Sequence, residues 1–149
     1  MSESTKKEIT AVVMRPAGIP DANGIVFTEE ALAAAVEMLN KRRHVSGEYG
    51  TPRLRNYDEA RRYIQVDEKN AVAFGRNFRM SDQGMLADVT MYGPYGSIAQ
   101  KIVDEGGLDR GEVAFSIRPF ILTDDIKDGM VTKFAPIAVD FVNLPKEKK

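Results

Sequence analysis

The pattern of apolar and polar positions predicts a chain of short strands with two helices between them. Its clearest strand lies within Gly-Glu-Val-Ala-Phe-Ser-Ile-Arg-Pro-Phe, residues 111–120, where one hydroxyl and one guanidinium stand among apolar side chains. We interpret residues 113–122 as the central strand and residues 130–142 as its antiparallel partner. The acidic, glycine-ended segment 124–129 turns between them.

Further strands are predicted on both sides of the first helix. Residues 9–14 form an apolar run that ends at Arg-Pro, and residues 44–49 form a second short run that ends at Gly-Thr-Pro. Residues 71–80 and 85–91 read as a hairpin, because Ser-Asp-Gln-Gly between them is typical turn chemistry. About six strands are therefore expected in all.

Two helices are predicted from apolar spacing and capping residues. The first begins after Thr28, a good N-cap, and carries an apolar face made of Leu32, Ala35, Val36 and Leu39. The second opens at Gly93–Gly96 and ends at a glycine pair, residues 106–107. The charged segment 53–62 is interpreted as an exposed loop or a short helix.

These elements predict one domain over residues 1–149, with short polar termini at residues 1–8 and 146–149. No internal repeat or second domain is visible. The fold class is α+β, and we expect a small, mostly antiparallel, partly closed β-barrel with about two helices packed outside it.

Composition excludes several classes of function. The net charge of −1 argues against a nucleic-acid-binding protein. The absence of cysteine and the presence of a single histidine exclude disulfides, thiolate metal sites and imidazole-based zinc sites. Asp124, Asp125 and Asp128 lack the ligand spacing of a calcium loop, and no phosphate-binding glycine motif is present. We therefore expect no metal, cofactor or small-molecule ligand.

The same sequence gives no sign of membrane association. No apolar run approaches the ~18 residues needed to span a bilayer, and residues 1–8 are too polar for a secretory signal. We expect the chain to be made in a cytoplasm.

Ser116 is the candidate nucleophile, but serine needs a base to attack at neutral pH. The chain has a single histidine, His44, as a candidate base. On its own a serine in a buried strand is usually a small polar residue bonded to a nearby carbonyl. Binding residues are not identifiable from the pattern.

The order of the motifs nevertheless resembles the prohead proteases of tailed bacteriophages, whose fold is similar to that of the herpesvirus assemblin proteases. The resemblance covers residues 9–145 and rests on three segments and their spacing: Gly-Glu-Tyr-Gly-Thr-Pro at 47–52, Val-Ala-Phe-Ser-Ile-Arg at 113–118, and Val-Asp-Phe-Val-Asn-Leu-Pro at 139–145. It implies that Ser116 occupies the nucleophile position, with Arg118 as the basic residue after it. At the position of the family's catalytic histidine this chain has Thr51. His44 lies seven residues before Thr51, and an odd offset in a regular strand puts two side chains on opposite faces.

Because a hydroxyl cannot take up a proton at neutral pH, we expect a non-catalytic component of a phage capsid, a decoration or cement protein, rather than an enzyme. Expected partners are the major capsid protein, other capsid subunits or another copy of the chain. The expected location is the virion capsid, after synthesis in the host cytoplasm. Candidate contact segments are residues 1–8, 53–62 and 145–149.

Two other hypotheses remain open. In the first, the chain is an active maturation serine protease that cuts scaffold and capsid-protein N-termini, and Ser116 is activated by His44 or by an unidentified base. Alternatively, the resemblance is a coincidence of strand order, and the chain is a small β-rich binding module.

Overall fold

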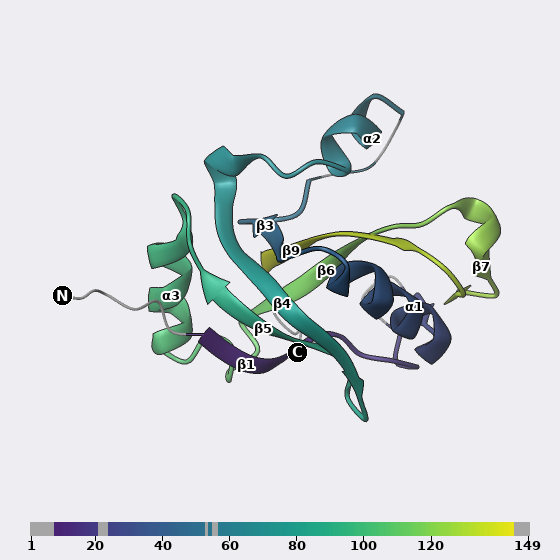
Figure 1. The fold of residues 1–149 in the computed structure, drawn as a ribbon, viewed down its shortest axis with the longest axis horizontal. Coiled ribbons are helices and arrows are strands. Elements are labelled where there is room, and N and C mark those ends of the chain that lie inside the picture. Colours follow the sequence, from purple (N-terminus) through teal and green to yellow (C-terminus); the bar gives the residue numbers. More distant parts are fainter. Residues whose placement is uncertain (1–7, 21–23, 53, 55–56, 145–149) are drawn as a thin grey trace, which may run out of the picture.

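The computed structural model describes residues 8–20, 24–52, 54 and 57–144 (Figure 1). Of the predicted contact segments, residues 145–149 lie outside the described residues, as do residues 1–7 and positions 53, 55 and 56. The described part contains a four-stranded antiparallel sheet, a two-stranded ribbon, a small three-stranded sheet and three α-helices.

The four-stranded sheet carries the predicted hairpin at its centre. Its strands, in spatial order, are β1 (Glu8–Arg15), β5 (Gly84–Met91), β4 (Ala71–Ser81) and β3 (Val45–Glu48). The β4–β5 hairpin closes at Ser81↔Gly84, as the turn chemistry predicts. The hairpin and both flanking strands are therefore confirmed, although β3 is shorter than expected.

Helix α1 (Glu29–Asn40) covers one face of this sheet and closes the core (Figure 1). Thr28 caps it by accepting a hydrogen bond from the amide of Ala31, 3.1 Å away. Leu32 and Leu39 on its apolar face are fully buried. At its last residue Asn40 bonds both backbone groups of Phe78 in β4. The predicted helix is thus confirmed in position and in the face it buries.

The central strand and its partner form the separate ribbon of β6 (Val113–Phe120) and β9 (Ala135–Asn143). The predicted pairing is correct, but the predicted partner strand 130–142 is two elements. Residues 130–131 form β8, which joins β2 (Val26–Phe27) and β7 (Ile126–Lys127) in the small sheet. Helix α3 (Gly96–Asp104) matches the second predicted helix.

The expected barrel is wrong, and the expected number of helices needs a correction. Within the described residues no sheet closes into a barrel, because the chain just after β3 meets β9 at one isolated parallel bridge, Tyr49↔Phe141. The strands cross there instead: a Cβ placed on Gly47 would lie 1.5 Å from the carbonyl oxygen of Val139. The described residues contain three α-helices rather than about two, since α2 (Tyr57–Tyr63) forms in and just past segment 53–62, the segment interpreted as an exposed loop or a short helix.

Candidate functional site

The candidate site lies on the face of the β6–β9 ribbon opposite the hydrophobic core. Alternate residues of a strand point to opposite faces, and the buried Phe115 and Ile117 point into the core. Ser116 and Arg118 therefore point the other way. Ser116 is directly opposite Asp140 in the register, and cross-strand partners place their Cβ atoms about 5 Å apart on one face. Ser116 and the carboxylate of Asp140 thus lie on the same face of the ribbon.

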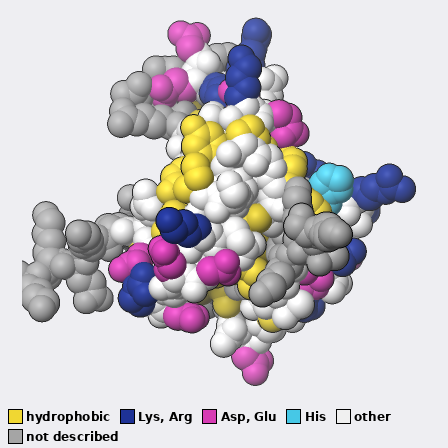
Figure 2. Space-filling view, turned by 90° about the vertical axis from the view of Figure 1, so that its left-hand side faces the viewer, with side chains coloured by type: hydrophobic (Ala, Val, Ile, Leu, Met, Phe, Trp, Pro, Cys, Tyr) yellow, Lys and Arg dark blue, Asp and Glu magenta, His cyan; other side chains and the backbone are white. Residues whose placement is uncertain are grey.

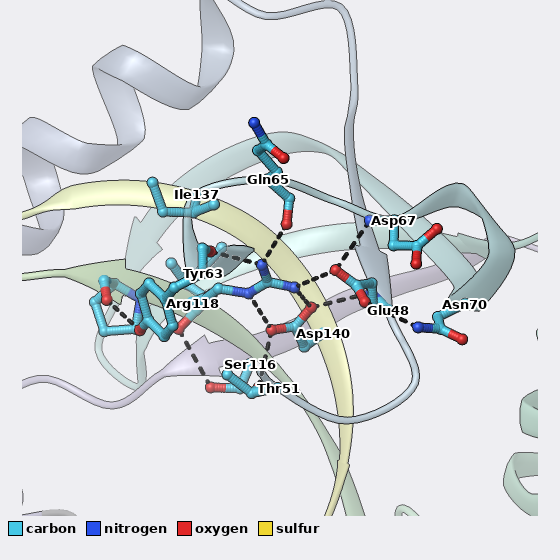
Figure 3. Close-up of polar contacts among 12 residues, drawn as sticks. Glu48, Thr51, Tyr63, Gln65, Asp67, Asn70, Ser116, Arg118, Ile137 and Asp140 are labelled. Carbon is cyan, nitrogen blue, oxygen red and sulfur yellow. Dashed lines mark hydrogen bonds and ion pairs between the residues drawn. The ribbon is translucent and has the colours of Figure 1, made fainter. Parts of the chain in front are cut away.

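The guanidinium of Arg118 is the centre of this face, as Figure 3 shows. Nε and Nη2 donate hydrogen bonds to the two carboxylate oxygens of Asp140, each at 2.8 Å. Nη2 also reaches Glu48 at 3.1 Å, and Nη1 donates to the carbonyls of Tyr63 and Gln65 at 2.8 Å. All three charged residues are at most 1% exposed. Burial acts to lower the pKa of Arg118, but the two carboxylates outweigh it and raise the pKa.

Glu48 extends the cluster toward the surface. Arg62 of α2 forms a bidentate pair with its carboxylate, and the amide of Asp67 donates to it at 3.1 Å. Burial acts to raise the pKa of Glu48, but the bonds from Arg62, Asp67, Arg118 and Asn70 lower that pKa to about 2. Glu48 is therefore ionised at neutral pH, and two arginines balance two carboxylates.

Thr51 lies on the outer side of Asp140. Its hydroxyl donates a 2.9 Å hydrogen bond to Oδ2 of Asp140, and the amide of Glu48 donates to Oδ1 at 3.0 Å. Together with Arg118, these donors give each carboxylate oxygen two hydrogen bonds. A carboxylate offers about four acceptor positions. All four acceptor positions of Asp140 are thus occupied. Thr51 is the residue that contacts Asp140 from the exposed side.

Ser116 has different neighbours. Nη2 of Arg15 donates to the serine Oγ at 3.2 Å and to the carbonyl oxygen of Ile117 at 2.9 Å, while the hydroxyl itself lies 3.5 Å from that carbonyl. Ser116 lines a pocket of about 300 Å³ between β1 and β6, whose other walls include Val13 and Leu144. The serine is therefore reachable from solvent beside a cation.

His44, the predicted alternative base, lies in other surroundings. Its ring packs against Phe74 with centroids 4.8 Å apart, and it lines a second pocket with Arg43 and Arg76. This histidine, the only one in the chain, is exposed at the surface near basic side chains (Figure 2). Within the described residues, no pocket and no hydrogen bond joins His44 to Ser116.

Sequence reasoning missed the partnership of Arg118, Asp140 and Glu48. A signal was available: each stands in a strand whose neighbours are apolar, and a buried charge needs an opposite one. The register that brings Asp140 opposite Ser116 is a tertiary feature. In the described part of the chain, no group of three His, Asp or Glu side chains could hold a metal ion. Nor does any helix there have the length and apolar character needed to cross a membrane.

Comparison with known proteins gives a match of structure only. No family model matches the chain, and no curated protein is similar in sequence. Among solved structures, the capsid assembly protease gp21 of bacteriophage T4 superposes with a TM-score of 0.65 at 17% sequence identity. The match covers 91% of this chain and 80% of that one. At this identity the likeness concerns the fold, and this chain has a fold of the phage capsid protease type.

Proposed function

We propose that this chain is a non-catalytic structural component of a tailed-phage capsid, built on the fold of a prohead protease. The observation that carries the proposal is the set of Ser116 contacts. The partners of its Oγ among the described residues are the guanidinium of Arg15 and a backbone carbonyl. Neither can take a proton from serine at neutral pH.

The surroundings of Asp140 support the same proposal. In a Ser-His-Asp triad the aspartate orients the histidine and stabilises its protonated form. Here the hydroxyl of Thr51 bonds to Asp140, and Arg118 and the Glu48 amide occupy the other acceptor positions. Loss of the base of such a triad lowers kcat by about 10⁶, or about 8 kcal/mol of barrier. A protease with that defect would not process a capsid.

Reaction with a serine-directed fluorophosphonate tests the non-catalytic part. We expect no labelling of the wild type and none of Ser116→Ala. Thr51→His keeps a donor toward Asp140 and adds a base on the Ser116 face, so we expect slow labelling that disappears in Thr51→His/Ser116→Ala. Labelling of the wild type that Ser116→Ala abolishes would show that the chain is an active serine enzyme.

The capsid role needs a separate experiment. Mass spectrometry of purified mature virions should find this chain among the head proteins, in stoichiometric amounts. Its absence from virions would contradict a decoration or cement role, whatever the outcome of the labelling.

An active maturation protease is the second candidate, and one observation favours it. Ser116 is accessible in its pocket, and the Arg15 guanidinium beside it has the charge needed to stabilise an oxyanion. In this case Ser116→Ala would stop the processing of scaffold and capsid-protein N-termini. We expect processing to be unchanged in that variant.

A further inference from the structure

A third pocket lies away from the Ser116 site. Its lining residues come from α1 and from the segments on either side of β7, elements that lie at one end of the molecule in Figure 1. Its volume is about 180 Å³, with Phe134 as its buried floor and Met38 and Phe120 among its walls. This volume is below the usual range of small-molecule sites. It is close to that of a cavity that holds one benzene, so the pocket fits a single apolar side chain.

The rim of this pocket exposes the kind of side chain that would fill such a space. Leu122, just beyond β6, is 59% exposed, and Met38 is 38% exposed. An aliphatic side chain that fills a pocket on the partner can anchor a protein interface. The rim thus provides both an anchor and a receptor for one.

The charges of the rim identify the occupant. Asp125 and Lys133 both line the pocket, and neither side chain has an ion-pair or hydrogen-bond partner among the described residues. A rim with one anion and one cation complements itself when two copies meet across a two-fold axis, since residue i then faces residue j in both directions. A strongly acidic partner would place a like charge opposite Asp125, and a strongly basic partner would place one opposite Lys133.

We propose that this surface, the Leu122 pocket, is the interface of a symmetric homodimer. Leu122 of each copy enters the apolar pocket of the other, and Lys133 of each copy pairs with Asp125 of the partner. The inference is independent of the proposed capsid function, because it concerns a different face of the molecule and does not involve Ser116.

Sedimentation velocity of the full chain, from micromolar to about 200 µM, tests this interface. We expect a concentration-dependent dimer for the wild type. Leu122→Asp should raise the dissociation constant by about 30-fold or more, the effect of losing a hot-spot side chain. The control is Ile98→Asp on α3, equally apolar and 48% exposed, which should leave the dissociation constant unchanged.

A charge exchange makes the test specific for the two-fold pairing. Asp125→Lys and Lys133→Asp should each weaken the dimer by like-charge opposition, and the double variant should restore it, because both pairs are then re-formed in reverse. Circular dichroism would confirm that each variant is folded. A wild type that stays monomeric at 200 µM, a Leu122→Asp dimer, or a double variant no tighter than the single ones would overturn the proposal. Protection of Leu122 only in assembled heads would assign the pocket to a capsid subunit instead.

Discussion

Replacement of Arg118 by methionine is the sharpest test of the buried cluster. Methionine keeps an unbranched apolar stem but removes the guanidinium and its five hydrogen bonds. Glu48 and Asp140, both at most 1% exposed, then lose their shared counter-charge. The carbonyls of Tyr63 and Gln65 lose a donor as well.

The size of the effect follows from burial. Removing one partner of a buried ion pair costs about 3–5 kcal/mol, because the remaining charge is left uncompensated. Arg62 still neutralises the outer side of Glu48, whereas no second cation contacts Asp140 among the described residues. We therefore expect a loss of about 4 kcal/mol, a large part of the ~5–15 kcal/mol that stabilises a typical domain.

Urea unfolding at pH 7 and pH 4 measures this loss. The deficit of Arg118→Met should be smaller at pH 4, since a buried carboxyl without its cation has a raised pKa and takes up a proton. Arg118→Lys, which keeps the charge but not the fork of donors, should show an intermediate loss. Arg76→Met is the matched control. Its guanidinium pairs with Glu8 at the surface, so the urea midpoint should hardly move.

Two outcomes would refute this reasoning. A loss below about 1 kcal/mol at pH 7 would mean that the cluster contributes little. An equal loss at both pH values would assign the effect to packing of the side chain rather than to its charge.

Three other predictions follow from the same architecture. Glu48 has a pKa of about 2 in the fold against 4.5 in a model peptide, so its stabilisation is complete above pH 4.5 and is lost as the pH falls toward 2. The free energy of unfolding should fall by about 3 kcal/mol over this pH range. In an acid titration, Glu48→Gln should not show this fall. Gly47→Ala should destabilise by about 3 kcal/mol or more in urea unfolding, because its Cβ would overlap the carbonyl of Val139; Gly96→Ala, which meets only ordinary contacts, is the control. Thr28→Ala should cost about 1 kcal/mol through the lost cap of α1, and Thr28→Ser should recover most of it.

Local signals in the sequence determined most of the secondary structure. The Ser-Asp-Gln-Gly turn fixed the β4–β5 hairpin, and Thr28 with its apolar face fixed α1, because turn chemistry and helix capping act over a few residues. The pairing of the Ser116 strand with β9 was also predictable, since two apolar runs joined by the acidic turn 124–129 are expected to pair as antiparallel strands. Prediction failed at 130–142, where β8 joins a parallel partner 104 residues away in sequence.

The site itself was determined only by tertiary structure. The sequence supplied Ser116, Arg118 and Thr51, but the register of β6 against β9 placed Asp140 opposite the serine. The crossing of β3 over β9 at Gly47 then brought Glu48 and Thr51 to the same carboxylate. Periodicity reports which face of a strand is buried, not which distant strand covers it. For that reason the buried ion cluster could not be assembled from the sequence, although each of its members was visible there.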